Sequence, residues 1–253
     1  DHRDLHSFPT RRSSDLETSV VALDKRNGNL LWKTKSLGGT RAYASSVIIE
    51  KAGLKLLLAQ TARYLMGINT ENGDIVWNFD LLPYHPGEIG IGANTNTPLY
   101  YDSKIFISSG YDHPGILLKL ADDAKSVSVI WTNPDFDNHI GGIVKIDGYL
   151  FGSNWKTNTT GNWICVDWNT GSTMYETKWF NKGPVISAND MLYCLEEKTG
   201  NLALVKPIPD KFDVVSSFRI EKGTGPYWAH PAIFDGRLYV RHGEWLMVYD
   251  LKN

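Results

Sequence analysis

Short apolar segments separated by polar turns run through most of the chain. Within residues 21–32, one apolar run ends on Asp24, Gly28 follows in a polar turn, and a second apolar run ends on Trp32. Asx and glycine residues at this spacing favour a tight turn, because glycine readily adopts the positive φ angles that such turns require. The pattern therefore predicts a β-hairpin whose aromatic residue packs against a neighbouring unit.

The same pattern recurs along the chain. Residues 66–77 repeat it fully, residues 118–131 keep an Asp eight residues before Trp131, and residues 164–175 end on Tyr175 instead of Trp. Internal self-similarity of this kind indicates a repeat architecture. The residues that we expect to dock one repeat onto the next are Asp24, Gly28, Trp32, Asn69, Gly73, Trp77, Trp131, Asp167 and Gly171.

A second hairpin is predicted upstream of each of these units. Asp147-Gly148 lies at the centre of one such hairpin, and Asp235-Gly236 lies at the centre of another. Two hairpins give four strands per repeat, and a period of about 40 to 50 residues is typical of a β-propeller blade. The sequence thus predicts an all-β fold, a propeller of four-stranded antiparallel blades.

One turn does not fit the period. Residues 196–200 resemble another docking turn, yet they follow Asp167 by only 29 residues. We interpret 191–195 as the second strand of a blade and 201–205 as the third, with strands named A to D from the propeller axis outward. Third strands then end near residues 24, 69, 123, 167, 207 and 250. The chain is predicted to hold strands C and D of one blade, four full blades, and strands A to C of a last one.

Composition narrows the function classes. The 253 residues carry 26 Lys and Arg against 28 Asp and Glu, so the net charge of -2 argues against nonspecific nucleic-acid binding. Two Cys cannot form a disulfide framework or a four-thiolate metal site. No run of about 18 apolar residues is present, so no transmembrane segment is predicted. Nine Trp, twelve Tyr and nine Phe supply ample apolar area for a core, which argues against disorder.

Residues 1–16 look foreign to the rest of the chain. They lack hydrophobic periodicity, and they match the translation of a common short-read sequencing adapter. We therefore expect residues 1–16 to be a non-native segment and residues 17–253 to form the propeller domain. On this interpretation the authentic N-terminus, with any signal peptide, is missing.

The pattern Ala22-x-Asp24-x-x-x-Gly28-x-x-x-Trp32 resembles the tryptophan-docking repeat of the pyrroloquinoline-quinone (PQQ) family of propellers. That family includes quinoprotein alcohol dehydrogenases and the lipoprotein that scaffolds outer-membrane protein assembly, and its architecture is related to WD40 and YVTN repeats. Residues 223–250 are similar to a bacterial branch of PQQ-like repeat proteins. The resemblance implies a periplasmic or extracellular protein, monomeric at full length. Since relatives usually have seven or eight blades, it also implies that this chain is the C-terminal portion of a larger ring.

Candidate ligand residues fall on one face of such a propeller. The A–B and C–D turns lie on one face, and the B–C and D–A loops lie on the other. The second face is predicted to hold Arg63, His85, Asn94, Asn96, His113, His139, Trp155, Trp228, His230 and His242. Two interpretations stay open for them: a site for a small molecule, glycan or protein partner, or structural roles in long loops, where polar residues accumulate. Gly and Pro beside His113 predict an exposed loop, as does the setting of His139, whereas His230 is also explained as a donor to a buried carbonyl.

Metal and cofactor chemistry find less support. No two His residues have the short spacing of a preformed metal site, so no metal is predicted. Quinoprotein enzymes of the family use a vicinal Cys pair beside PQQ and a calcium ion, whereas Cys165 and Cys194 are far apart in sequence. We interpret both as buried thiols, with a disulfide between them as the alternative. The first hypothesis is a non-catalytic binding scaffold in the bacterial envelope. The second is a fragment of a PQQ-dependent alcohol or sugar dehydrogenase.

Overall fold

Six antiparallel sheets make up the computed structural model, which describes residues 18–38, 40–85 and 94–251. Residues 1–16, expected to be non-native, lie outside the described residues. Blade 1 consists of β1 (Val21–Leu23) and β2 (Leu30–Lys33). Blade 2 consists of β3 (Val47–Lys51), β4 (Leu54–Gln60), β5 (Tyr64–Asn69) and β6 (Ile75–Asp80), and a short 3-10 helix, η2 (Leu82–Tyr84), follows it.

The remaining blades follow in chain order. Blade 3 consists of β7 (Leu99–Tyr101), β8 (Lys104–Ile107), β9 (Gly115–Leu120) and β10 (Val127–Asn133), and blade 4 of β11 (Ile143–Ile146), β12 (Tyr149–Ser153), β13 (Trp163–Asp167) and β14 (Thr173–Thr177). Blade 5 consists of β15 (Val185–Ala188), β16 (Met191–Leu195), β17 (Asn201–Lys206) and β18 (Asp213–Arg219), and blade 6 of β19 (Ala232–Phe234), β20 (Arg237–His242) and β21 (Trp245–Asp250).

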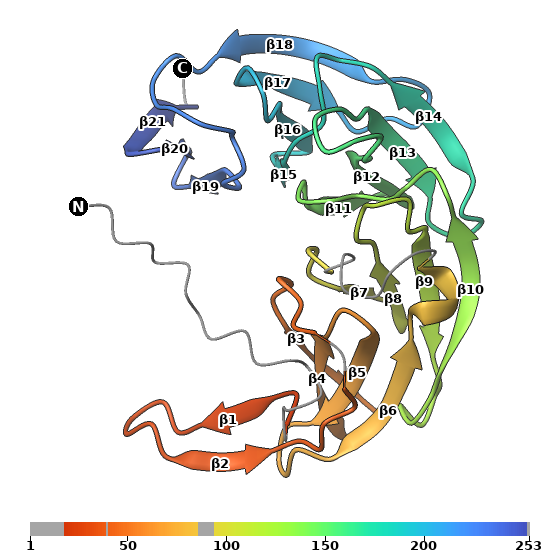
Figure 1. Cartoon of the computed structure of the whole chain (residues 1–253). Coiled ribbons are helices and arrows are strands. Elements are labelled where there is room, and N and C mark those ends of the chain that lie inside the picture. The colour runs from red at the N-terminus through yellow and green to blue at the C-terminus, as the bar shows by residue number, and fades with distance from the viewer. Residues whose placement is uncertain (1–17, 39, 86–93, 252–253) are drawn as a thin grey trace.

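The blades are arranged around a common axis as an open arc (Figure 1). Strands β3, β7, β11, β15 and β19 line the inside, and β6, β10, β14 and β18 form the outer rim. The predicted partition of strands is confirmed: strands C and D of one blade, four full blades, and strands A to C of the last. Residues 196–200 do connect the second and third strands of blade 5, so the out-of-phase turn is a B–C loop.

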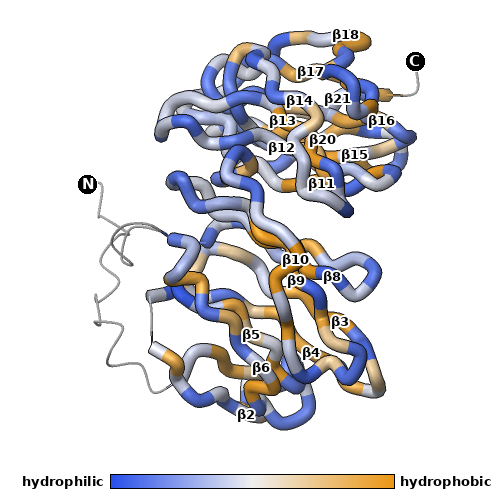
Figure 2. Tube along the Cα trace, turned by 90° about the vertical axis from the view of Figure 1, so that its right-hand side faces the viewer, coloured by the Kyte–Doolittle hydropathy of each residue, from blue (hydrophilic) through white to orange (hydrophobic). Residues whose placement is uncertain are grey.

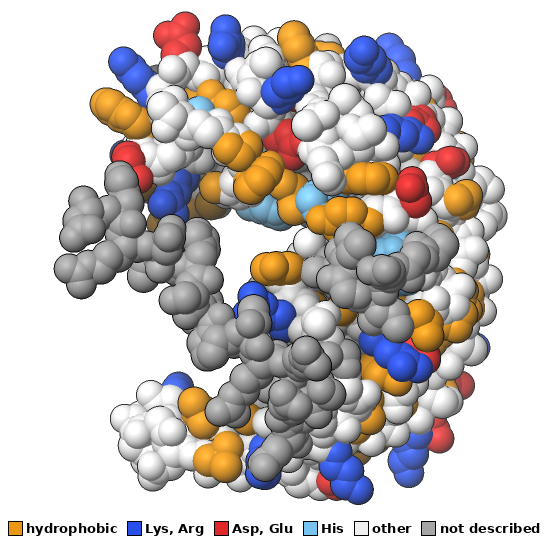
Figure 3. Space-filling model, viewed as in Figure 1, with side chains coloured by type: hydrophobic (Ala, Val, Ile, Leu, Met, Phe, Trp, Pro, Cys, Tyr) orange, Lys and Arg blue, Asp and Glu red, His pale blue; other side chains and the backbone are white. Residues whose placement is uncertain are grey.

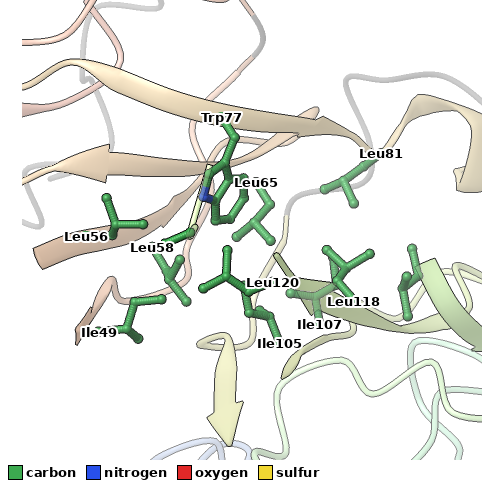
Figure 4. Packing of buried hydrophobic residues seen from close by; sticks show 12 residues of the cluster. Ile49, Leu56, Leu58, Leu65, Trp77, Leu81, Ile105, Ile107, Leu118 and Leu120 are labelled. Atoms are coloured by element: carbon green, nitrogen blue, oxygen red, sulfur yellow. The ribbon is translucent and has the colours of Figure 1, made fainter. Parts of the chain in front are cut away.

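The core lies between the blades rather than within any one of them. Leu58 and Leu65 of blade 2, for example, form one buried cluster with Ile105 and Leu118 of blade 3 (Figure 4). Burying an aliphatic side chain of this size contributes about 1.5 to 3 kcal/mol, so each blade is stabilised mainly by its neighbours. Figure 2 shows the result along the chain, with apolar residues concentrated in the strands and hydrophilic residues in the turns.

The indoles of Trp32 and Trp131 join consecutive blades at the predicted turns. Trp32 Nε1 donates to the Thr70 carbonyl at 2.9 Å, and its ring covers Gly73, where a Cβ would lie only 2.7 Å from it. Trp131 covers Gly171 in the same way and donates to the Trp168 carbonyl at 3.0 Å. Both glycines have positive φ, so the turn needs glycine for its backbone as well as for space.

The third repeat departs from this arrangement. Strand β9 ends at Leu120, three residues earlier than expected, because the turn starts with the N–H of Ala124 donating to the Ala121 carbonyl. Ala124 has a φ of 58°, a left-handed conformation that glycine tolerates better. Trp77 lies in the same buried cluster as Ala124, and its indole N–H has no hydrogen-bond partner. In the third repeat, Trp77 thus keeps the apolar contact with the turn of the next blade, but its indole N–H does not donate a hydrogen bond to that turn.

Candidate functional site

The B–C and D–A loops, together the loop face, hold the predicted ligand residues except His242, which ends strand β20 on the same face. They divide into three groups rather than one cluster. Arg63 lies in the β4–β5 loop of blade 2 and Asn94 in the loop that leads from blade 2 to blade 3, whereas Trp228, His230 and His242 lie beside blades 5 and 6. Asn96, His113, His139 and Trp155 lie between these groups, in loops of blades 3 and 4. Several His side chains are visible along the inner margin of the arc (Figure 3).

Arg63 and Asn94 are held by bonds within the molecule. The guanidinium of Arg63 pairs with Asp80 at 2.8 Å, and these side-chain hydrogen bonds hold the pKa of Asp80 below its ordinary value. The Asn94 amide donates to the Thr61 carbonyl at 2.6 Å and is almost fully buried. Both side chains therefore fix the loops around strand β5 in this structure.

Buried asparagines link the loop before blade 3 to the loop before blade 4 and to blade 4 itself. Asn96 Nδ2 donates to the Asn138 carbonyl at 2.7 Å, and Asn138 Nδ2 donates in turn to the Ser153 carbonyl at 2.6 Å. The backbone N–H of Gly142 donates back to Asn96 Oδ1. Each such bond satisfies a carbonyl that the loops would otherwise bury unpaired. Asn138 and Ser153 escaped the sequence reasoning, since isolated Asn and Ser residues in loops carry no distinguishing pattern.

An aromatic cluster forms where the loops of blades 3 and 4 meet. Tyr111 and His139 share a hydrogen bond of 2.9 Å between the hydroxyl and Nε2. The ring of Trp155 lies 5.6 Å from that of Tyr111, centroid to centroid. Tyr111 and Asp112 both have a φ of 60°, a strained backbone that surrounding contacts must hold in place. The contacts around Tyr111 and Asp112 therefore hold the cluster in one defined conformation.

Asp137 supplies one of those contacts. Its carboxylate accepts the backbone N–H of Asp112 at 3.2 Å and that of Trp155 at 3.0 Å, and so joins the β8–β9 loop to the β12–β13 loop. The residue is only 3% exposed, and burial raises its pKa to about 7. Asp137 was not predicted, because nothing in the sequence shows that its side chain points inward.

The histidines near this cluster are poorly suited to be cations. His85 stacks on His113 with ring centroids 3.8 Å apart and the planes nearly parallel. Burial lowers the pKa of His85 and of His139 to about 4, and it lowers that of His113 as well. His113 is buried, contrary to the exposed loop that the sequence indicated, because its ring packs under His85 and bonds Ser109 Oγ. At neutral pH these rings are uncharged.

Hydrogen bonds of His230 and His242 hold the β18–β19 loop against blade 6 and against the loop that leads into blade 4. His230 Nε2 lies 2.8 Å from the Ile140 carbonyl, which agrees with the carbonyl interpretation of this residue. Both ring nitrogens of His242 lie within 2.7 Å of carbonyl oxygens, those of Lys222 and Gly225. The ring of His242 also stacks on Tyr227, with 3.5 Å between ring centroids.

Tyr227 repeats on the loop face what the tryptophans do on the opposite face. Its ring covers Gly200, which has a φ of +76°, and its hydroxyl donates to the Ile220 carbonyl at 2.9 Å. The turn it covers, residues 196–200, has the local form of a docking turn. The sequence pattern was therefore a true docking turn, placed on the other face of the blade.

Exposed aromatic rings remain on the loop face. Tyr43 is 69% exposed, and Phe180 and Trp228 are each 58% exposed, one in each of three D–A loops. Among the described residues no three His, Cys, Asp or Glu side chains are placed to hold a metal ion. Cys165 and Cys194 are both buried and unbonded. The loop face thus offers apolar contact area, while the polar groups predicted to bind a ligand are engaged by the protein itself.

Comparison with known proteins establishes the family. The family model described as outer membrane protein assembly factor BamB, a PQQ-like repeat model, matches residues 11–177, more than half of the chain. The chain belongs to this family. No curated protein matches its sequence.

Solved structures agree on the fold. BamB from Moraxella catarrhalis is 14% identical with a TM-score of 0.66, and the match covers 92% of this chain and 66% of that one. The designed protein Ika8 is 8% identical with a TM-score of 0.62, covering 92% and 65%. A quinohemoprotein alcohol dehydrogenase from Pseudomonas putida is 13% identical with a TM-score of 0.59, covering 88% and 44%. The chain therefore spans less than two thirds of the length of these structures. Within the part that the structure describes, no helix is long and apolar enough to cross a membrane.

Proposed function

We propose that this chain is part of a non-catalytic scaffold of the bacterial envelope, periplasmic or extracellular, that binds a protein partner through its loop face. One observation carries the proposal. The loop face exposes the aromatic rings of Tyr43, Phe180 and Trp228, while its polar side chains are already hydrogen-bonded within the molecule. Exposed aromatic residues are the usual anchors of protein–protein interfaces, since they bury much area at little entropic cost.

The family supports the same choice. The family model is described as an outer membrane protein assembly factor, and this description favours a protein partner over a small molecule or glycan. A partner from the machinery that assembles envelope proteins fits both this description and the aromatic loop face. The aromatic cluster around Trp155 and Tyr111 would then lie at the centre of the contact, between the loops that carry the exposed rings.

The second hypothesis, a fragment of a PQQ-dependent dehydrogenase, has less support. The free thiols of Cys165 and Cys194 lie in the apolar core between blades 4 and 5, away from the loops. The sequence has no two adjacent Cys residues, and among the described residues no three His, Cys, Asp or Glu side chains are placed to hold a metal ion. We therefore propose no step through PQQ. Titration of the intact protein with PQQ and calcium, followed by quinone absorbance and dye-linked alcohol oxidation, tests this directly, and a positive result would replace the scaffold proposal.

Cross-linking tests the scaffold. A photo-reactive amino acid placed at residue 155 of the full chain is expected to capture a discrete protein from bacterial envelope extracts. The triple variant Tyr43→Ser, Phe180→Ser, Trp228→Ser should reduce that capture at least about tenfold, because hot-spot aromatics dominate interface energies. Phe234→Ser is the matched control, since Phe234 is 75% exposed but precedes an A–B turn on the opposite face. Equal capture by the triple variant and the parent protein would refute the proposal.

A further inference from the structure

A fully buried lysine lies beneath the loop that carries Trp155. Lys182 precedes strand β15 and is only 2% exposed. Lysine is almost never buried to this degree unless its charge is paired, because moving an ammonium group out of water is costly. The surroundings of Lys182 must therefore replace its hydration shell.

Four oxygen atoms do so. Lys182 Nζ lies 3.0 Å from Glu197 Oε1, and it donates to the backbone carbonyls of Thr157 at 2.9 Å, Asn158 at 3.1 Å and Thr160 at 3.4 Å. Three carbonyls from one short turn and one carboxylate surround a single positive charge. This set of hydrogen-bond acceptors resembles a binding site for a small ammonium ion, with the ion attached to the chain as the end of the lysine side chain.

The neighbouring residue, Asn181, also hydrogen-bonds the backbone of this loop. Asn181 Oδ1 accepts the backbone N–H of Gly161 at 2.9 Å, and Asn181 Nδ2 donates to the Thr159 carbonyl at 2.7 Å. Asn181 and Lys182 together therefore bind backbone groups of every residue from 157 to 161. A Cβ at Gly161 would lie 2.8 Å from the Lys182 stem, so the loop closes tightly on it.

Apart from these two side chains, the turn is ordered by its own hydrogen bonds, such as those that the N–H groups of Lys156 and Thr157 donate to the Thr160 carbonyl at 3.0 Å. The side chains of residues 157–160 are all exposed, so no apolar anchor holds this turn against the core. This turn also contacts the aromatic cluster, since Trp155 Nε1 donates to Asn158 Oδ1 at 3.2 Å. A path of direct contacts thus runs from the buried ammonium through Asn158 to the indole.

We propose that Asn181 and Lys182 are positioning residues for the β12–β13 loop, and that the Lys182 ammonium fills a cation site that a free primary alkylammonium ion can occupy when the side chain is shortened. Its consequence for binding rests on the proposed function: if Trp155 lies at the partner contact, partner affinity depends on this buried charge. The site itself does not depend on the identity of any partner.

Hydrogen exchange of the full-length protein tests the site. In Lys182→Ala, amide exchange at residues 159–162 is expected to rise at least about tenfold relative to strands β12 and β13, because the turn loses the ammonium that binds three of its carbonyls. Millimolar propylammonium should restore the protection, whereas tetramethylammonium, which has no N–H, should not. Lys178→Met, which alters an exposed lysine of the same D–A loop, is the control and should leave the exchange unchanged.

A second variant guards against loss of the fold. Lys182→Ala leaves Glu197 buried without its partner, so Lys182→Met with Glu197→Gln removes both charges and keeps the packing of both stems. This double variant should fold and still exchange rapidly at residues 159–162. Unchanged exchange in it, or equal rescue of Lys182→Ala by both ions, would overturn the proposed site. Faster exchange with unchanged cross-linking from residue 155 would leave the site standing and count against the proposed partner contact.

Discussion

The two faces of the arc hold neighbouring blades together by different means. On the turn face, Trp32 and Trp131 cover glycines of the next blade and donate to its carbonyls, and this contact is repeated at the junctions of blades 1 and 2 and of blades 3 and 4. On the loop face, Tyr227 makes one such contact with Gly200, and the other links are buried polar side chains such as Asn138 and Asp137, each in its own arrangement. The repeated contact does not depend on pH, because neither indole nor glycine titrates. It is lost when a side chain added at the glycine overlaps the indole. The polar links all depend on which loops meet, and the link through Asp137 depends on its ionisation as well.

The largest effect is expected where an indole covers a glycine. Gly73→Val should destabilise the protein by about 3 kcal/mol, because a branched side chain is strained at positive φ and overlaps Trp32. Gly28→Val is the matched control: Gly28 also has positive φ, but nothing lies within 4 Å of its added Cβ. It should cost only about 1 to 2 kcal/mol. Urea denaturation of both variants measures the difference, and equal losses would show that packing of Trp32 contributes nothing at this junction.

A pH-dependent effect is expected on the loop face. Since burial raises the pKa of Asp137 to about 7, the folded state holds its proton more tightly than the unfolded state does. The stability that Asp137 contributes is therefore full below about pH 4 and is lost as the pH rises through 7. His85 and His139, with pKa values lowered to about 4, act in the opposite direction, since their contribution is lost as the pH falls.

The variant Asp137→Asn isolates the carboxyl group. The unfolding free energy of the parent minus that of the variant should fall between pH 4 and pH 7, by about 1.4 kcal/mol for each unit of pKa difference. Because the histidines are present in both proteins, their contribution cancels in this subtraction. A difference that stays constant with pH would mean that Asp137 titrates at its ordinary value. On the turn face, Gly73→Val should show no such pH dependence.

The smallest effect compares two junctions on the turn face. Trp131→Phe leaves the Trp168 carbonyl without its donor, whereas Trp77→Phe removes an indole N–H that has no partner. Both rings are buried, so the loss of apolar area is similar. Trp131→Phe should therefore cost about 1 kcal/mol more than Trp77→Phe in thermal or urea unfolding. A larger loss for Trp77→Phe would contradict the view that the third repeat lacks the bond.

The sequence predicted the fold closely because the docking turns are local. An Asx, a glycine and an aromatic residue at fixed spacing specify a hairpin wherever they occur, so the repeat was visible without any tertiary information. The strand boundary that differs from the prediction, at Leu120, precedes a turn in which Ala124 has the left-handed conformation that glycine adopts more easily. The turn at 196–200 was correctly assigned to a B–C loop from its spacing alone.

The loop face was predictable only in outline. The topology allocates His113, His139 and Trp155 to one face, and the sequence could place them there. It could not show that His113 is buried under His85, since burial depends on how two loops from different blades meet. It also could not show that Lys182 points inward, because lysines are usually solvated.

By itself, the sequence determined the all-β repeat, the allocation of strands to blades and the glycines that the turns require, because each of these depends on residues close together in the chain. The tertiary structure alone decided which polar groups are engaged, which aromatic rings stay exposed and where an ammonium is buried. Those properties arise from contacts such as that of Lys182 with Thr157, which join segments that no local pattern relates. Burial changes the charge and availability of a side chain, and burial is a property of the assembled blades.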